Sequence, residues 1–309
     1  MARSLSSRRP GEAENAERNP SFLRSSAPSR LDPSLHLGIV ADEISRDFAD
    51  AVRIGLPLGL RRYEIRNLKS GRAPMCDEAE LLEVERIAAA EGVEITALSP
   101  GLFKFTETAE AFRTEMAEVY PRAADLAKGW NLPGLIVFGF HKGVGADSAN
   151  PDEDRRKRLS HQWLLEARDR AAEDGLLLMV EPEPICCIDT ARGAAALGVR
   201  INYDPGNVAW LTGHDPIDEF EAAAPSISNV HIKNLRLPGP EWLPAGEGII
   251  DYRRHFAALQ RAGYAGPISL EPHMEGSPEA IRRCRDAVLR LWESAQRGET
   301  QCESRAETP

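Results

Sequence analysis

From residue 35 to residue 296 the chain alternates short apolar, strand-like runs with longer amphipathic segments. Each strand-like run is rich in branched hydrophobic residues, and a segment with helical periodicity follows it. The strand-like runs are 35–44, 61–67, 94–100, 133–140, 176–184, 199–207, 227–234 and 266–273. Near-continuous apolar strands that alternate with helices are typical of a parallel sheet covered by helices, and eight repeats favour closure into a single (βα)₈ TIM barrel of the α/β class.

The segments between these runs have helical patterns. The clearest covers 77–92, with acidic residues in its first turn and Gly92 as the predicted stop. Other helices are expected over 47–60, 108–130, 155–175, 190–198, 215–225, 251–263 and 277–296.

Both ends of the chain differ from this pattern. Residues 1–34 are expected to form a disordered N-terminal tail and 296–309 a flexible C-terminal tail, which leaves 35–295 as the barrel domain. The first stretch is rich in Arg, Ser, Pro, Asn and Glu without apolar periodicity, so it cannot bury enough surface to offset its ordering entropy. Arg8 and Arg9 suggest a twin-arginine signal, but no apolar stretch follows them, and export is rejected. A start codon assigned too far upstream is an equal explanation.

Composition narrows the functional classes. The 309 residues are 42% hydrophobic and 28% charged, which is ordinary for a globular enzyme. The net charge of −10 favours neither nucleic acid nor anionic membranes as partners, and no apolar run approaches the roughly 20 residues of a membrane span. Five cysteines without CxxC spacing indicate reduced thiols and a cytoplasmic location. No GxGxxG or GxxxxGK[ST] motif follows the first strand, which weakens nucleotide-binding alternatives.

Four of the strand-like runs end on a side chain that can bind a divalent cation. The runs LLLMVE, VRINYD, ISNVH and PISLE end on Glu181, Asp204, His231 and Glu271. In a barrel of parallel strands, the C-terminal strand ends converge on one face, where the chemistry of such enzymes lies. Three carboxylates and one imidazole suit a hard or borderline divalent ion better than a metal that prefers thiolates. The sequence predicts one divalent metal ion here, with Mn²⁺ as first choice and Mg²⁺, Co²⁺ or Zn²⁺ as alternatives.

The other strand ends also carry polar side chains that could contact a substrate. These candidates are Glu43, Arg66, Lys104, His141, Asn207 and Lys233. A cationic fringe of Arg66, Lys104 and Lys233 around an acidic centre suits a polyhydroxylated, anionic substrate. Simpler alternatives stay open: Glu43 or Arg66 in an ion pair on the barrel rim, His141 as a loop histidine, and Lys233 reaching solvent.

Aromatic residues near these strand ends have three open interpretations: a wall on which a sugar stacks, a contact between subunits of a homo-oligomer, or ordinary packing. They are Phe103, Phe105, Trp210 and Trp242. Histidines in helix-like or loop segments are assigned no functional role; they are His36, His161, His214 and His255.

The motifs VEPEP, NYDPGN, NVHIKN, SLEPH and the block PAGEGIIDYRRHFAALQRAGYAGPISLE resemble the sugar phosphate isomerase/epimerase family over roughly residues 35–293. These xylose isomerase-like barrels include ketose 3-epimerases, hydroxypyruvate isomerases, inosose dehydratases and endonuclease IV. The resemblance implies that Glu181, Asp204, His231 and Glu271 correspond to the family's metal ligands. In the epimerases the two glutamates also exchange protons with the substrate carbon, one on each face of a cis-enediolate held by the metal. Asn207 stands where the epimerases carry a histidine that orients substrate, which counts against epimerase chemistry without affecting the metal site.

Taken together, the sequence predicts a cytoplasmic, metal-dependent sugar isomerase or epimerase that acts on a ketose or keto-sugar by proton transfer through a metal-bound enediolate. Glu181 and Glu271 are the predicted catalytic pair. A metal-dependent lyase or dehydratase that eliminates from a 3-keto-sugar or glycoside would use the same two glutamates and remains the alternative. A non-catalytic sugar-binding barrel is less favoured.

A DNA-repair endonuclease of the same fold is rejected. It needs extra histidines at strand ends where this chain has Arg66, Ser99 and Asn207. The identity of the sugar, its phosphorylation and the oligomeric state stay open.

Overall fold

The computed structural model describes residues 35–144, 153–274 and 276–298, which belong to one compact unit, Asp32–Pro309. The predicted N-terminal tail, 1–34, lies outside the described residues, as do 299–309 of the predicted C-terminal tail. The last described helix ends at Gln296, close to the predicted end of the barrel domain.

Eight parallel strands form the central sheet of the described residues. They are β1 (Leu37–Val40), β2 (Arg62–Ile65), β3 (Glu94–Leu98), β4 (Gly134–Phe138), β5 (Leu177–Glu181), β6 (Arg200–Tyr203), β7 (Ile227–Ile232) and β10 (Ile268–Leu270). Each lies within one of the predicted strand-like runs, because runs of branched apolar residues fit strands that are buried on both faces.

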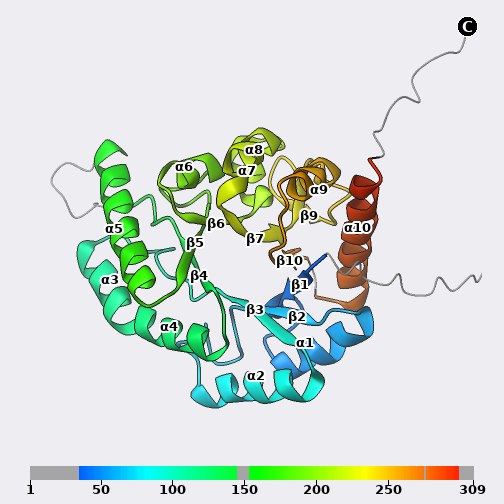
Figure 1. The fold of residues 1–309 in the computed structure, drawn as a ribbon, viewed down its shortest axis with the longest axis horizontal. Coiled ribbons are helices and arrows are strands. Elements are labelled where there is room, and N and C mark those ends of the chain that lie inside the picture. The colour runs from blue at the N-terminus through cyan, green and yellow to red at the C-terminus, as the bar shows by residue number, and fades with distance from the viewer. Residues whose placement is uncertain (1–34, 145–152, 275, 299–309) are drawn as a thin grey trace, which may run out of the picture. The chain divides into compact units, whose positions relative to one another are not determined.

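The sheet closes almost completely into a barrel. The strand order is β3-β2-β1-β10-β7-β6-β5-β4, so the first and last strands pair directly. β3 and β4 face each other across a seam without a ladder, where the amide of Phe138 donates a hydrogen bond to the carbonyl of Leu102 at 3.0 Å. Figure 1 shows the helices arranged around these strands. The predicted (βα)₈ barrel is confirmed.

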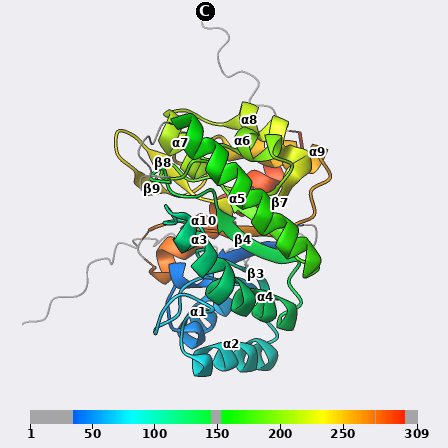
Figure 2. The same ribbon diagram turned by 90° about the vertical axis from the view of Figure 1, so that its left-hand side faces the viewer.

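Except for the one over residues 205–212, the surrounding helices follow the predicted segments closely. They are α1 (Phe48–Gly55), α2 (Glu78–Glu91), α3 (Ala109–Thr114), α4 (Tyr120–Gly129), α5 (Glu153–Glu173), α6 (Ala191–Ala196), α7 (Pro205–Thr212), α8 (Ile217–Ala223), α9 (Tyr252–Arg261) and α10 (Pro278–Gln296). Short 3₁₀ turns occupy Ala41–Glu43, Leu56–Leu58 and Ala224–Ser226. In Figure 2, α4 and α5 lie over the β3–β5 side of the barrel.

Local chemistry explains where two helices stop or change. Helix α2 ends at Gly92, which adopts a left-handed conformation with φ 61°, as the sequence predicted. The predicted single helix over 108–130 is instead divided by a π-helical segment, Glu115–Val119. Pro121, in the first turn of α4, has no N–H to continue the α-helical ladder, so the hydrogen-bond pattern shifts at this point.

Two elements beside the C-terminal strand ends were absent from the sequence prediction. Helix α7 starts directly after β6, so residues 205–207, which the sequence analysis placed in the strand-like run 199–207, are helical instead. A two-stranded antiparallel hairpin, β8 (Asn234–Arg236) and β9 (Glu241–Leu243), follows β7 and carries Trp242.

The barrel interior has an apolar part and a polar part. Ala97, Ile136 and Met179, from β3, β4 and β5, form a buried hydrophobic cluster. On the β2, β6 and β7 side, Glu64, Asn202 and Asn229 are buried instead. Buried polar groups need hydrogen-bond partners, so these three residues are expected to contact the polar side chains at the C-terminal ends of the strands.

Candidate metal centre

The four predicted ligands converge at the C-terminal ends of neighbouring strands. Glu181 is the last residue of β5, Asp204 follows β6, His231 lies near the end of β7 and Glu271 follows β10. One donor atom from each lies within 4.8 Å of those of the others, and all four side chains are buried. Residues separated by up to 90 positions meet here because parallel strands bring their carboxyl ends to the same face.

The spacing of the donor atoms suits a shared cation. His231 Nδ1 lies 3.2 Å from Glu271 Oε2 and 3.6 Å from Glu181 Oε2. Two ligand atoms bound at right angles to one ion of this class lie about 3 Å apart. Asp204 Oδ2 is buried and has no hydrogen-bond partner of acceptable geometry, although the ammonium of Lys233 is 2.6 Å away. A carboxylate oxygen with a free lone pair inside this group fits a metal ligand.

His231 is held by a carboxylate on its far side. Its Nε2 atom lies 2.9 Å from Oε2 of Glu64, which belongs to β2 and is fully buried. A partner on one ring nitrogen leaves the other for a metal, and such outer partners orient metal-binding histidines. His231 Nδ1 is therefore the nitrogen directed at Glu181 and Glu271.

Amide side chains hold Glu181, at the end of β5, through both of its carboxylate oxygens. Asn202 Nδ2 donates to Glu181 Oε2 at 2.9 Å, and Asn207 Nδ2 donates to Glu181 Oε1 at 3.1 Å. Asn229 Nδ2 donates to Asn202 Oδ1 at 2.9 Å and lies 3.3 Å from Glu64 Oε2. This chain of amides links the environments of Glu181 and His231.

Asp204 has a second role in the local fold. Its Oδ1 atom accepts hydrogen bonds from the backbone amides of Gly206 at 2.8 Å and Asn207 at 3.3 Å, so Asp204 is the N-cap of α7. The cap fixes the side chain and turns Oδ2 toward the centre.

Burial and neighbouring charges act in opposite directions on the pKa values of the residues in this buried group. Burial raises the pKa of Asp204 to about 7, and the nearby Glu271 and Glu181 add to this while Lys233 acts against it. Burial disfavours the charged form of His231, but Glu64, Glu271 and Glu181 raise its pKa well above the usual value. Burial also acts against ionised Glu271, whose pKa is nevertheless lowered well below its ordinary range, first by Lys233 and then by His231. The carboxylates thus create a strongly cation-attracting site.

Lys233 and Arg66, two of the predicted substrate-binding residues, contact these carboxylates directly. Lys233 Nζ lies 2.6 Å from Asp204 Oδ2 and 3.0 Å from Glu271 Oε2, and its side chain is only 2% exposed. The alternative in which Lys233 reaches solvent is therefore wrong. Arg66 pairs with Asp42, Glu43 and Glu271 through different nitrogens of its guanidinium.

The remaining predicted substrate residues form ion pairs with residues other than the four candidate ligands. Glu43 is buried and accepts from Arg66 Nη2 at 2.8 Å, which is the rim ion pair considered from the sequence. Lys104 pairs with Glu183 and lies 4.6 Å from the ring centroid of Phe138. His141 Nδ1 lies 2.6 Å from Glu107, with no contact to the candidate ligands among the described residues. The structure brings Glu43, Arg66, Asn207 and Lys233 to the centre, and places His141 outside it.

Several polar residues at the centre were not assigned from the sequence. Glu64, Asn202, Asn229 and His273 are the clearest. Asn202 and Asn229 stand two positions before Asp204 and His231, so in a strand they face the same way. A polar residue two positions before a candidate ligand in an otherwise apolar run is the signal that could have identified these amides.

The aromatic candidates divide between packing and the mouth of the site. Phe103 is fully buried and stacks on Phe140 at 4.7 Å between centroids, so it is a core residue. Trp242 lies on the β8–β9 hairpin. Its ring centroid is 5.1 Å from that of His273 and 6.2 Å from that of the half-exposed Trp210. Lys233 Nζ lies 5.5 Å from the centroid of Trp242, which places this ring beside the candidate centre.

A second group of possible metal donors overlaps the first. Glu43, Glu271 and His273 also bring donor atoms within 4.8 Å of one another. This group has three donors, one of them on the 31% exposed side chain of His273, whereas the first group has four donors that are all buried. The four-residue group is accordingly the better metal site.

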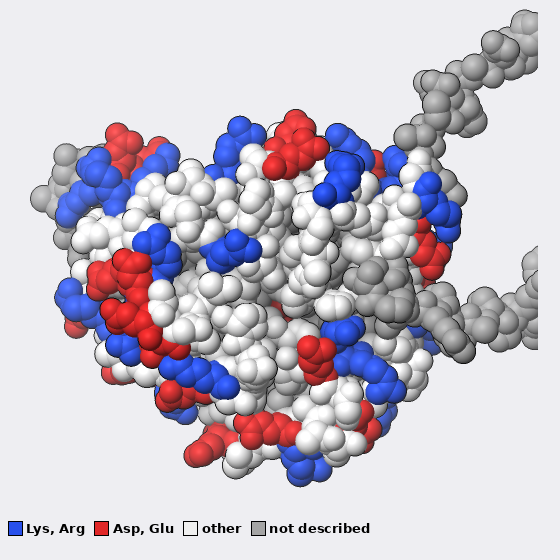
Figure 3. Space-filling model, viewed as in Figure 1, with Lys and Arg blue, Asp and Glu red and all other residues white. Residues whose placement is uncertain are grey.

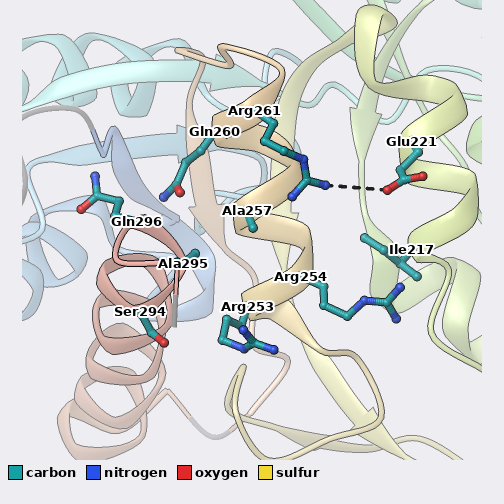
Figure 4. Close-up of a pocket in the computed structure, with 11 residues that line it drawn as sticks. Ile217, Glu221, Arg253, Arg254, Ala257, Gln260, Arg261, Ser294, Ala295 and Gln296 are labelled. Carbon is teal, nitrogen blue, oxygen red and sulfur yellow. Dashed lines mark ion pairs between the residues drawn. The ribbon is translucent and has the colours of Figure 1, made fainter. Parts of the chain in front are cut away.

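A separate cavity of about 720 Å³ lies on the outer helices and is not this centre. It opens between α8, α9 and α10, and Arg253, Arg254 and Arg261 project around it (Figure 4). Arg261 pairs with Glu221 at 3.7 Å, and the lining includes none of the candidate ligands.

The charges on the molecular surface are mixed. On the face shown in Figure 3, basic and acidic side chains alternate around the rim and neither sign forms one continuous patch. Within the described part of the chain, no helix is both long enough and apolar enough to span a membrane.

Comparison with known proteins relates the sequence to sugar enzymes. A family model described as a xylose isomerase-like TIM barrel matches residues 57–290. The chain is 26% identical over 187 residues to the L-ribulose-5-phosphate 3-epimerase UlaE of Escherichia coli strain K12, an alignment that covers 58% of this chain and 64% of that protein. The chain therefore matches less than two thirds of the length of this curated relative.

Solved structures share the fold at low sequence identity. The IOLI protein, solved with a zinc atom, has a TM-score of 0.67 at 16% identity and covers 84% of this chain and 99% of its own. A xylose isomerase-like TIM barrel protein of Mycobacterium smegmatis, solved with magnesium, has a TM-score of 0.63 at 20% identity over 80% of this chain and 89% of its own. The "probable 3-DHS dehydratase AsbF" of Bacillus anthracis has a TM-score of 0.62 at 18% identity and covers 83% of this chain and 98% of its own.

Proposed function

The chain belongs to the xylose isomerase-like TIM barrel family, and on this basis we propose that it is a divalent-metal-dependent isomerase or epimerase of a ketose or another keto-sugar. One observation carries the proposal: Glu181, Asp204, His231 and Glu271 offer four buried donor atoms within 4.8 Å of one another. The similarity to a curated sugar-phosphate 3-epimerase supports the reaction class.

We propose that these four residues hold one divalent ion, with Mn²⁺ as first choice. Oxygen and imidazole donors suit Mn²⁺, Mg²⁺, Co²⁺ and Zn²⁺, and two structures with the same fold contain magnesium or zinc. Once bound, the ion would polarise the carbonyl of a keto-sugar and acidify the adjacent C–H.

Glu181 and Glu271 then serve as the proton-transfer pair. Asn202 and Asn207 donate to the two oxygens of Glu181, and Arg66 donates to Oε1 of Glu271. Each carboxylate is thus fixed in orientation, which general acid–base catalysis requires. In this proposal one glutamate removes a proton from the carbon beside the carbonyl, and the other returns a proton to the substrate.

The substrate would lie between the acidic centre and the mouth of the barrel. Arg66 and Lys233 supply positive charge at the centre, and Lys104 supplies it farther out beside Glu183. Trp242 and His273 border this space with an aromatic edge. Hydroxyl or phosphate oxygens of a sugar suit such donors, so we assign Arg66, Lys104, Lys233, Glu43 and Asn207 to substrate binding, with His141 at the periphery.

Elimination from a keto-sugar is the second candidate. The resemblance to the epimerases implies that Asn207 stands where they carry a histidine that orients substrate, and the AsbF dehydratase shares the fold. A lyase would begin with the same proton abstraction and then lose a β-substituent. The first chemical step is common to both reactions, so the fate of the product distinguishes them.

Deuterium incorporation tests the proposed function. The purified full-length chain would be incubated in D₂O with Mn²⁺ and a panel of free, phosphorylated and 3-keto sugars, followed by NMR. Incorporation beside the carbonyl without fragmentation supports an isomerase or epimerase, and incorporation with an unsaturated product supports the lyase. Binding of sugars without any exchange would instead support the non-catalytic barrel.

We also propose a cytoplasmic location, in keeping with four unpaired cysteines among the described residues.

A further inference from the structure

Lys233 is an unusual occupant of the candidate metal centre. It lies on the strand end two residues after His231, and its ammonium contacts Asp204 Oδ2 at 2.6 Å and Glu271 Oε2 at 3.0 Å. Its side chain is 2% exposed, and lysine is almost never buried to this degree without paired charges. Two of the four candidate metal ligands are therefore already shared with a protein cation.

A divalent ion and this ammonium cannot both keep these contacts at full strength. An ion bonded to Asp204 and Glu271 at about 2.2 Å would place its double charge close to Lys233 Nζ, where the repulsion in a buried site is large. Lys233 must therefore move its charge away when the metal binds.

The rest of the residue is fixed, so only the tip can move. Tyr252 holds the backbone on both sides: the Lys233 amide donates to its hydroxyl at 3.1 Å, and that hydroxyl donates to the Lys233 carbonyl at 2.7 Å. The first part of the side chain packs on Gly206, where an added Cβ would lie 2.4 Å from Lys233 Cγ. The anchored stem limits the ammonium to a short displacement.

The direction of that displacement is defined by two neighbours. His273 Nε2 lies 3.3 Å from Lys233 Nζ, and the ring centroid of Trp242 lies 5.5 Å away. The side chain of His273 is 31% exposed, so these residues mark the open side of the centre. An ammonium that turns toward them leaves the carboxylates and faces the space assigned to the substrate.

We infer that Lys233 is an internal cation that stabilises the metal-free ligand set and is displaced by the metal toward His273 and Trp242, where its ammonium contacts a substrate oxygen. This inference rests on the proposed metal site and specifies how one residue of that site changes partners. Lys233 would thus stabilise the metal-free protein and also compete with the metal for Asp204 and Glu271.

The test compares the wild type with Lys233→Met, which keeps the length of the side chain and removes its charge. Isothermal titration of the metal-free full-length proteins with Mn²⁺ should show binding tighter by about tenfold or more in the variant, because the competing cation is gone. The variant without metal should melt at a lower temperature than the metal-free wild type. Lys233→Arg retains a cation and should bind Mn²⁺ no more tightly than the wild type.

Lys104→Met is the matched control. It also removes one positive charge near the site, but Lys104 pairs with Glu183 and not with a candidate ligand. If it tightens Mn²⁺ binding as much as Lys233→Met does, the effect is general electrostatics and the inference is wrong. Equal or weaker Mn²⁺ binding by Lys233→Met overturns the inference while the metal site stands. An absence of Mn²⁺ binding in the wild type overturns the proposed metal site together with the inference.

A measurement on the wild type does not depend on the stability of the variants. Lysine acetylation followed by mass spectrometry should show faster labelling of Lys233 after Mn²⁺ is added, because the ammonium moves toward the open side. Labelling of Lys128, an exposed lysine paired with Asp174, should not change. Unchanged labelling of Lys233 in protein shown to contain Mn²⁺ would contradict the displacement.

Discussion

The imidazole Nε2 of His231 lies 2.9 Å from the carboxylate Oε2 of Glu64, on the side of the ring that faces away from the other candidate ligands. Neither residue has appreciable contact with solvent. Because an outer carboxylate fixes the orientation of a metal-binding histidine and increases its basicity, the metal site depends on Glu64 as well as on the four ligands.

Glu64→Gln should weaken Mn²⁺ binding by roughly 10- to 100-fold, the usual effect of changing an outer partner of a metal ligand. Glutamine keeps the shape of the side chain but not its charge. Calorimetric titration with Mn²⁺ measures the effect. Glu94→Gln, at an exposed position on β3 that pairs with Arg62, is the control and should bind the ion normally. Unchanged affinity in Glu64→Gln would show that Glu64 only fills space.

Asp204→Asn should abolish most of the thermal stabilisation by Mn²⁺ while helix α7 remains capped. Asparagine is as good an N-cap as aspartate, so the hydrogen bonds to the amides of Gly206 and Asn207 can persist. The variant loses the charged oxygen at the centre. Melting curves with and without Mn²⁺ measure the difference. A variant with the full Mn²⁺-induced shift would remove Asp204 from the ligand set.

Glu181→Gln and Glu271→Gln should each lower turnover by roughly 10²–10⁴, the range for loss of a general acid or base. Each variant keeps an oxygen that can bind metal, so Mn²⁺ should remain bound when measured by metal analysis. The assay is deuterium exchange with the substrate found in the sugar panel. Glu91→Gln, exposed near the end of α2, should exchange at the wild-type rate. Near-normal rates in both active-site variants would leave these glutamates as ligands only.

Trp242→Ala should raise KM by roughly 2- to 10-fold, which corresponds to the contribution of one aromatic contact. The ring borders the substrate space beside His273 and Lys233. Steady-state kinetics give KM, and a Mn²⁺ titration of the same variant should match the wild type. If KM stays the same while the melting temperature falls, Trp242 is a packing residue of the hairpin.

Asp215→Asn should cost roughly 1–3 kcal/mol in the free energy of unfolding at neutral pH, because it weakens a partly buried, charge-assisted hydrogen bond. Asp215 Oδ1 lies 2.7 Å from Nε2 of His255, whose ring packs against Tyr203 and Phe220. Urea denaturation measures the loss, and Mn²⁺ binding should be unaffected.

The same pair gives a pH dependence with a defined sign. Burial alone would raise the pKa of Asp215, but the hydrogen bond and charge of His255 lower it below its usual value. A carboxylate with a lowered folded-state pKa stabilises the protein above its unfolded pKa, and this stabilisation is lost as the pH falls through the folded pKa. The difference between the wild type and Asp215→Asn should therefore shrink below about pH 4. A difference that grows on acidification would contradict the assignment.

The strand ends that carry the ligands could be predicted from sequence because each combines two local signals. An apolar run predicts a buried strand, and a polar residue at its end stands out against that run. Glu181 and Glu271 show both signals within a few residues. Their convergence then follows from the geometry of parallel strands and needs no knowledge of particular contacts.

Partners joined only through the barrel could not be predicted in this way. Glu64 and His231 are 167 residues apart, and nothing in the spacing of either indicates the other. Lys233 is a second example. Its position two residues after His231 correctly predicted that both side chains face the same way. Its burial could not be predicted, because it depends on Asp204 and Glu271, which follow other strands. Helix α7 was also absent from the prediction: its first residues, 205–207, were assigned to the strand-like run 199–207, because the N-cap that Asp204 provides appears only in the fold.

Gly206 and Lys233 also constrain how this protein can change through mutation. Gly206 lies in α7 without a positive φ, and an added Cβ there would meet Lys233 Cγ at 2.4 Å, the Lys233 carbonyl oxygen at 3.0 Å and Asp204 Oδ1 at 3.1 Å. A smaller residue at 233 would remove the closest of these contacts, while those with the backbone carbonyl of residue 233 and with Asp204 would remain. We therefore expect the effects of mutation at the two positions to be coupled: alanine at 206 should be tolerated better where the lysine, and with it the internal cation of the site, has been lost.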